Sequence, residues 1–449
     1  MSLLEATRAI QDWITDHRRH LHRIPELAYQ EERTSAYLTE VLEGLGLEVR
    51  GGLGGGTGLT VDLGAGEAPL VALRADMDAL PITEDSGVDY ASENAGCMHA
   101  CGHDSHMAML LGAARLLKER EADLPGPVRL IFQPAEEGGA GAKAMLEDGV
   151  LEGVDRIFGI HVWPGNATGT VGLRDGAFLA SAGFFEIILT GVGGHAAMPH
   201  LAVDPVVAAA HVVTGLQSIV SRERDPFGSN VVSVTQLRAG DAYNVIPRDV
   251  YLAGTLRSLS LEDQTANAAR IEELTKGIAA AHRCEAEVRF PGTIYPPTIN
   301  HGHALDVARE VADAELGGWI ENPPTMGGED FSFFAQEVPA AFCALGIAAG
   351  AEERLRHEGR QEQRVLFQEQ RPLAGVVGAP GHDLQQLYRL KRRELAVVLG
   401  EDRVDDRRSH CIQIRPHQLL HLAHQRAVAV QRAVAQQRRL HFLYLIACI

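Results

Sequence analysis

Short apolar runs alternate with longer amphipathic patterns along the first 170 residues, and this alternation limits the possible folds more than any other feature. Residues 5–45 have the apolar spacing of two helices, and residues 105–122 have that of another. The runs PLVALRADMDALP, PVRLIFQP and RIFGIHVWP are nearly continuous apolar stretches, which are typical of strands buried on both faces of a sheet. Strands and helices that alternate in this way predict an α/β fold with a mostly parallel mixed sheet flanked by helices.

The pattern changes near residue 182. From there to residue 290 the order becomes strand, helix, strand, strand, helix, strand, which is the order of a ferredoxin-like α+β sandwich. We therefore predict a first domain built from residues 1–181 and 291–350, with a smaller domain inserted at 182–290. Residues 351–449 form an atypical basic tail.

The formal net charge of −18 combines two unlike parts of the chain. Residues 351–449 hold 17 basic and 11 acidic residues and are rich in Gln, Arg and His. The preceding 350 residues hold 24 basic and 48 acidic ones. Because a phosphate backbone binds a basic face, the acidic balance predicts no nucleic-acid partner.

The cellular location is predicted from cysteine usage and from the apolar segments. Six cysteines without a disulfide-like framework favour a reducing compartment. The N-terminus lacks the uninterrupted apolar core of a signal peptide, and no apolar run approaches the roughly 20 residues of a membrane span. We therefore expect a cytoplasmic protein without a membrane partner.

The strongest chemical signal is the segment CMHACGHDSH, at residues 97–106. Cys101 and His103 lie two residues apart at the start of a predicted helix, after a glycine turn, so both side chains can point at one metal ion. Thiolate and imidazole are both good ligands for Zn²⁺. The alternative is a loop rich in Cys and His that binds no metal.

Other metal-competent residues follow the apolar strands. Glu136 and Glu137 come after PVRLIFQP, so one carboxylate can bind a metal while its neighbour takes a proton from water. Asp78 follows another strand, and His161 lies in RIFGIHVWP. A solvated glutamate pair and a core histidine are the alternatives for these residues. However, ligands gather at the carboxyl ends of parallel strands, and three strands of this chain share the pattern.

Eight motifs occur in a consistent order, and together they resemble one family. They are RADMDALP, MHACGHDSHMAMLLGAA, FQPAEEGGAGAKAM, GIHVWP, GGHAAMPH, NVIPRDVYLAGTLR, YPPTIN and GGEDFSFF. The chain resembles the aminoacylase/carboxypeptidase-type metallopeptidases from about residue 10 to residue 347. Within them it is similar to the amidohydrolase branch, which includes hippurate hydrolases, N-acyl-amino-acid amidohydrolases and plant-type IAA-amino acid hydrolases. The resemblance implies a zinc-peptidase-like fold with an inserted lid domain through which the protein forms a homodimer.

The resemblance also implies a two-metal site that binds Zn²⁺ or Mn²⁺. The matching positions are the metal ligands Cys101, His103, Glu137 and His161, the general base Glu136, Asp78 orienting a ligand, the lid oxyanion donor His195, and the carboxylate-binding pair Asn244 and Arg257. Without the resemblance, His195 is a residue of a glycine turn and Arg257 is a charge on a strand surface. Glu329 and Asp330 match a loop near the metals and are expected to have a structural role.

One part of the family pattern is absent. The family has a further His ligand in an LHxPxF-like segment after the strand that ends near Leu345, and this chain has no such segment there. His357 and His382 are the nearest histidines, and neither lies in that motif. We hypothesise that the tail is translated from a shifted reading frame or an unspliced segment. If the tail is genuine, one metal has lost a ligand.

The resemblance predicts a metal-dependent amidohydrolase. It would cleave the amide bond of N-acyl amino acids, such as IAA-amino acid or hippurate-like conjugates, to a carboxylic acid and a free amino acid. One alternative is a catalytically impaired family member that acts as a binding or regulatory protein. The other is a peptidase or deacylase that acts on small peptides.

Overall fold

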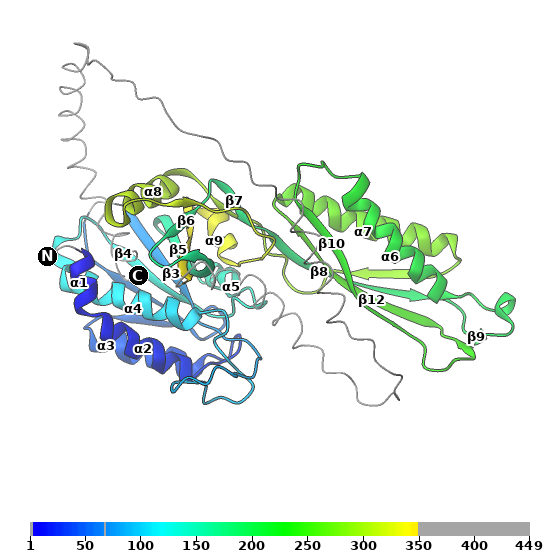
Figure 1. Cartoon of the computed structure of the whole chain (residues 1–449), viewed down its shortest axis with the longest axis horizontal. Coiled ribbons are helices and arrows are strands. Elements are labelled where there is room, and N and C mark those ends of the chain that lie inside the picture. The colour runs from blue at the N-terminus through cyan, green and yellow to red at the C-terminus, as the bar shows by residue number, and fades with distance from the viewer. Residues whose placement is uncertain (1–2, 67–68, 349–449) are drawn as a thin grey trace, which may run out of the picture. The chain divides into compact units, whose positions relative to one another are not determined.

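The computed structural model describes residues 3–66 and 69–348, and its elements are shown in Figure 1. The predictions made for the tail, including those for His357 and His382, fall outside these residues. Within the described chain, no helix is both long and apolar enough to cross a lipid bilayer.

Within the described residues, the larger sheet has eight strands. In chain order they are β1 (Val49–Leu53), β2 (Gly58–Leu63), β3 (Leu70–Asp76), β4 (Val128–Gln133), β5 (Val154–Ala167), β6 (Val171–Leu173), β15 (Ile320–Glu321) and β16 (Ala340–Ala348). Their order across the sheet is β1-β2-β4-β3-β5-β16-β6-β15. The pairs β4–β3, β3–β5, β5–β16 and β6–β15 are parallel, whereas β1–β2, β2–β4 and β16–β6 are antiparallel. The predicted mostly parallel mixed sheet is therefore confirmed.

Helices cover both faces of this sheet. One apolar core includes buried residues of α1 (Leu3–Ala9), α2 (Gln11–Arg23), α3 (Glu32–Gly44), α4 (His103–Glu119) and α8 (Gly302–Leu316). The opposite core includes α5 (Gly141–Glu147) and α9 (Phe331–Glu337). Within β3, Leu73 belongs to the first core and its neighbour Ala72 to the second, because successive strand side chains point to opposite faces.

The N-terminal segment differs from its prediction in one detail. Residues 5–45 were expected to form two helices, and three are present because the chain turns at Ile10 between α1 and α2. The turn leaves Ile10 buried in the same core as Leu3 and Ala6, so the apolar spacing continues across the break. A pattern of buried positions therefore does not reveal this interruption.

A second sheet carries the ferredoxin-like pattern. Its strands β8 (Ser181–Thr190), β10 (Asn230–Ala239), β12 (Asp249–Ser258) and β13 (Glu285–Arg289) are antiparallel and lie in the order β10-β12-β8-β13. Helices α6 (Pro205–Arg222) and α7 (Leu261–Ala281) pack side by side against it (Figure 1). Asp204 and Ser260 cap these helices by accepting hydrogen bonds from Val206 N and Asp263 N. The strand and helix order is the one expected for residues 182–290.

Two short ribbons complete the described structure. β9 (Gly194–His195) pairs with β11 (Val245–Ile246), and β7 (Gly176–Leu179) pairs with β14 (Thr298–Asn300). The 3₁₀ turns are η1 (Glu121–Asp123) and η2 (Pro199–Leu201). The boundaries proposed for the two domains stay a prediction.

Candidate metal centre

The candidate ligands lie where the central strands of the larger sheet end. β3 and β4 are parallel to β5 and both end at this edge, whereas β5 continues past it, with His161 level with the end of β3. Helix α4 begins at the same edge. Gly102, with φ 96°, precedes its first residue, and a Cβ at Gly102 would lie 2.5 Å from Val162 Cγ2. Only glycine therefore fits the turn that places His103 beside β5.

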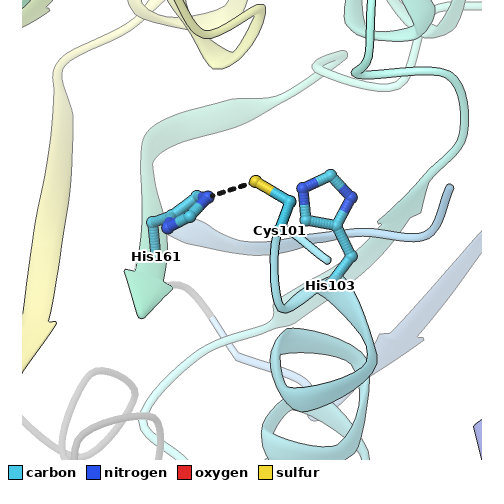
Figure 2. A group of neighbouring side chains, drawn as sticks. All are labelled: Cys101, His103 and His161. Carbon is cyan, nitrogen blue, oxygen red and sulfur yellow. Dashed lines mark hydrogen bonds between the residues drawn. The ribbon is translucent and has the colours of Figure 1, made fainter. Parts of the chain in front are cut away.

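Three potential metal ligands converge at this edge. Cys101 comes from the loop before α4, His103 from the first residue of α4 and His161 from β5. Their ligand atoms lie within 4.8 Å of one another, and Cys101 Sγ lies 3.3 Å from His161 Nε2 (Figure 2). Burial and the charge of Glu137 raise the pKa of Cys101, so the thiol would ionise only with a cation beside it. As a thiolate with two imidazoles, this arrangement suits a divalent transition metal.

The two imidazoles are held in the tautomer that a metal requires. His103 Nδ1 lies 2.9 Å from the Asp78 carbonyl oxygen, and His161 Nδ1 lies 2.8 Å from the Val162 carbonyl oxygen. Because a carbonyl only accepts, each Nδ1 donates, so Nε2 is the nitrogen that carries the lone pair when the ring is neutral. His103 Nε2 is buried and has no hydrogen-bond partner within the described residues. Such an orphaned nitrogen fits a metal ion as its missing partner.

The charges at this edge act strongly on the ionisable side chains. Burial lowers the pKa of His161 to about 3, and the charge of His106 acts in the same direction, so His161 is neutral. Burial also disfavours a charged His103, but Asp76 beside it raises the net pKa well above the ordinary value. A divalent cation at His103 would replace that proton, because both need the same lone pair.

Asp78 fixes the backbone of Glu136 and Glu137 by hydrogen bonds. Its Oδ1 accepts a hydrogen bond from Glu136 N at 3.0 Å, and its Oδ2 accepts one from Glu137 N at 2.9 Å. With the backbone fixed in this way, carboxylate oxygens of both glutamates lie within 4.8 Å of a His103 ring nitrogen. Burial raises the pKa of Glu137 to about 7. Burial, with the charges of Glu329 and Glu137, raises the pKa of Glu136 well above its usual value.

A charge cluster beside the candidate ligands was not predicted from the sequence. Arg74 on β3 is fully buried, and its guanidinium contacts Asp76 at 2.8 Å, Glu329 at 3.0 Å and Asp330 at 3.1 Å. Asp330 N lies 3.4 Å from Glu136 Oε1. The signal that could have found this cluster is an arginine inside an apolar run, because a buried cation needs acidic partners.

His106 is a second residue that the sequence left without a role. Its Nδ1 lies 2.6 Å from Asp76 Oδ1, and its Nε2 accepts a hydrogen bond from Val162 N at 3.0 Å. Both ring nitrogens are therefore occupied. His106 holds the backbone of β5 next to His161, which places the His161 ring.

His195 and Asn244, the candidate residues at the β9–β11 ribbon, are arranged differently. His195 is exposed on β9, where its Nδ1 accepts a hydrogen bond from Ala197 N, and Asn244 accepts one from Ala196 N through its carbonyl oxygen. Within residues 3–66 and 69–348, no hydrogen bond or ion pair joins either side chain to the candidate ligands.

Arg257 on β12 is half-buried and carries no ion pair within the described chain. Its side chain donates to Thr255 Oγ1 at 3.2 Å, and burial lowers the pKa of its guanidinium. A Cβ at Gly328 would lie 3.1 Å from Arg257 Nη1. The fold therefore places an uncompensated cation beside the loop that contains Glu329 and Asp330.

Comparison with known proteins gives consistent matches. The sequence matches the family described as peptidase family M20/M25/M40 over residues 72–363. It is 46% identical over 352 residues to IAA-amino acid hydrolase ILR1-like 2 of Arabidopsis thaliana, covering 77% of this chain and 80% of that protein. It is 41% identical over 330 residues to N-acetyl-L-cysteine deacetylase of Bacillus subtilis (strain 168), covering 73% and 79%. Among solved structures, the YXEP protein of Bacillus subtilis, a dinuclear metal-binding peptidase from the M20 family, has a TM-score of 0.66 and 37% identity over 76% of this chain and 89% of that one.

Proposed function

This chain belongs to peptidase family M20/M25/M40, and from that premise we propose that it hydrolyses N-acyl amino acids as a metal-dependent amidohydrolase. The substrate class is an IAA-amino acid or hippurate-like conjugate, and the products are a carboxylic acid and a free amino acid. The observation that carries the proposal is the loop at Glu136 and Glu137, which Asp78 turns toward His103. Two carboxylates beside His103 support a general base next to a metal ligand, the combination that metal-assisted amide hydrolysis uses.

The metal ligands in this proposal are Cys101, His103, Glu137 and His161. When bound, two divalent cations polarise the scissile carbonyl and stabilise the negative charge that develops there. The Cys101 thiolate favours Zn²⁺, and the carboxylate and imidazole ligands also allow Mn²⁺. Because no LHxPxF-like segment follows Leu345, we expect one of the two cations to be bound more weakly than the other.

The remaining steps belong to side chains of this protein. Glu136 takes a proton from the attacking water and returns it to the leaving amine. Arg257 binds the free carboxylate of the amino-acid part, for which a guanidinium without another ion pair is well shaped. Asn244 lies beside His195, at the other end of β12 from Arg257. In the site of a second protomer, Asn244 assists Arg257 and His195 donates a hydrogen bond to the developing oxyanion.

Metal content and turnover test the proposal together. We expect about two divalent ions per chain and turnover of hippurate, acetyl-amino acids or indoleacetyl-amino acids. Removal of the ions with a chelator should abolish turnover, and Zn²⁺ or Mn²⁺ should restore it. One ion or none with no turnover would favour a binding or regulatory protein. Faster cleavage of dipeptides than of acyl amino acids would favour the peptidase.

We further propose that the protein is a homodimer that associates through the inserted lid domain, residues 182–290. Exposed apolar side chains occur around the β9–β11 ribbon: Val192, Met198, Leu201, Tyr243 and Val245. A monomeric protein rarely exposes so many large apolar side chains close together, and such a patch marks an interface. Contact through this ribbon would also bring His195 toward the other protomer.

Light scattering after size-exclusion chromatography measures the association directly. We expect a dimer for the wild type and a monomer with reduced turnover for Leu201→Asp, because Leu201 is 69% exposed and would be buried in the interface. Ile320→Asp is the matched control, since Ile320 is an exposed apolar residue of the larger sheet, and it should remain dimeric. A monomeric wild type with full turnover would contradict the dimer.

A further inference from the structure

We infer that Tyr295 is a positioning residue that ties the loop of Glu136 to the segment where the larger and second sheets are joined, and so sets kcat. The inference rests on the proposed function, because it assigns Tyr295 a part in the placement of the general base.

The phenol of Tyr295 bridges two backbone groups of the Glu136 loop. Its hydroxyl donates to the Glu136 carbonyl oxygen at 2.8 Å and accepts a hydrogen bond from Ala140 N at 2.9 Å. The residue is 6% exposed, and its ring packs edge-on against Phe333. One buried oxygen therefore fixes both ends of the segment that follows the general base.

The backbone of Tyr295 is itself held at the start of the second sheet. Tyr295 and Ala182 exchange two hydrogen bonds, at 2.8 and 3.0 Å. Ala182 lies in β8 and is paired directly with Arg257 of β12. Tyr295, Ala182 and Arg257 thus lie side by side, and this row connects the Glu136 loop to the arginine proposed to bind the substrate carboxylate.

The row is also packed closely against the loop that contains Glu329. A Cβ at Gly328 would lie 2.6 Å from the Ala182 Cβ and 3.1 Å from Arg257 Nη1. Such close packing leaves little freedom for Ala182 to shift. A residue hydrogen-bonded to Ala182 is therefore a firm anchor for the loop that it holds.

The Glu136 loop needs an anchor, because its backbone is strained at two positions. Ala135 and Ala140 have φ values of 55° and 57°, in the left-handed region that residues with a Cβ rarely adopt. Such conformations persist only where the surrounding contacts impose them. The amide of Ala140 is the one that donates to Tyr295, so the phenol helps to impose one of the two strained conformations.

Replacing Tyr295 by Phe removes both hydrogen bonds and keeps the ring. Because small displacements of a catalytic group are costly, we expect kcat to fall by about 10- to 100-fold. KM should change less than about threefold and metal content should not change, since the hydrogen bonds of Tyr295 reach neither the Arg257 side chain nor a proposed ligand. A kcat within about twofold of wild type would overturn the inference.

Tyr29→Phe is a matched control. The Tyr29 hydroxyl donates to the Gly139 carbonyl oxygen at 2.6 Å, so this variant also removes a tyrosine hydrogen bond from the same loop. Tyr29 is 40% exposed and lies outside the row of Tyr295, Ala182 and Arg257, so we expect kcat to stay within about threefold of wild type. Equal losses of kcat in the two variants would overturn the inference, because any hydrogen bond to this loop would then have the same effect as that of Tyr295.

Turnover by the wild type tests the proposed hydrolase activity. The ratio of kcat in Tyr295→Phe to kcat in the wild type tests the role of Tyr295. If the wild type cleaves no amide, hydrogen exchange of the amides from 136 to 142 decides the inference instead. We expect exchange there to be at least about tenfold faster in Tyr295→Phe and unchanged in Tyr29→Phe. Equal exchange in wild type and Tyr295→Phe would overturn it.

Discussion

Glu136→Gln is expected to reduce kcat by about 10²- to 10⁴-fold while the protein keeps its metal content. The substitution removes the basic oxygen but preserves the size of the side chain. The hydrogen bonds that fix the loop also remain, because Asp78 and Tyr295 contact the backbone of residue 136 and not its side chain. The change therefore isolates proton transfer from the structure around it. Initial rates on an acyl amino acid, with metal analysis of the same preparation, measure both effects.

A substitution of the adjacent Glu137 is the control for Glu136→Gln. Glu137→Gln removes the same charge one residue later, from a side chain proposed to bind metal, and it should lower metal content as well as turnover. Both variants are therefore expected to lose turnover, but only Glu137→Gln should also lose metal. Retained turnover in Glu136→Gln would remove Glu136 from the role of base, and equal loss of metal in both variants would make Glu136 a ligand.

The main sheet could be predicted because strands buried on both faces must be apolar at almost every position. β3 is buried from Val71 to Asp76, and its sequence is correspondingly apolar apart from Arg74 and Asp76. β1 shows the opposite case. Its sequence VRGGL is largely exposed, so no apolar run marks it, and its antiparallel pairing with β2 was not predicted.

The proximity of Cys101, His103 and His161 could also be predicted from the sequence, because parallel strands end at one edge of a sheet. The partners of Arg74 were not. Glu329 and Asp330 follow it by 255 and 256 residues, and no local pattern connects positions so far apart. The motif GGEDFSFF indicated that these two carboxylates lie near the metals, but it did not indicate that a buried arginine binds them.

Arg74→Met is expected to lower the free energy of unfolding at pH 7 by about 3–5 kcal/mol. It leaves the buried Asp76 carboxylate, whose pKa is held well below its usual value by His103, His106 and Arg74, without its arginine partner. Methionine is unbranched and fills much of the same space, so the loss of charge dominates over the loss of packing. Urea unfolding of variant and wild type at equal metal content measures the difference. Arg289→Met is the control, since Arg289 and Glu287 form an ion pair in which both side chains are more than half exposed, and little change is expected.

The pH dependence separates lost charge from a damaged core. Burial already raises the pKa of Asp330 to about 8, and Arg74 opposes this shift. Without Arg74 the pKa in the folded state rises further, while the value in the unfolded state stays near 4. A carboxyl whose pKa is raised by folding reduces stability progressively as pH rises from the unfolded to the folded value. Between pH 4 and about pH 8 this loss is the same in wild type and variant, because Asp330 is protonated in both folded proteins. The deficit of Arg74→Met that comes from Asp330 should therefore be flat up to about pH 8 and grow above it. A deficit that does not grow above about pH 8 would mean that packing, and not charge, is what Arg74 supplies.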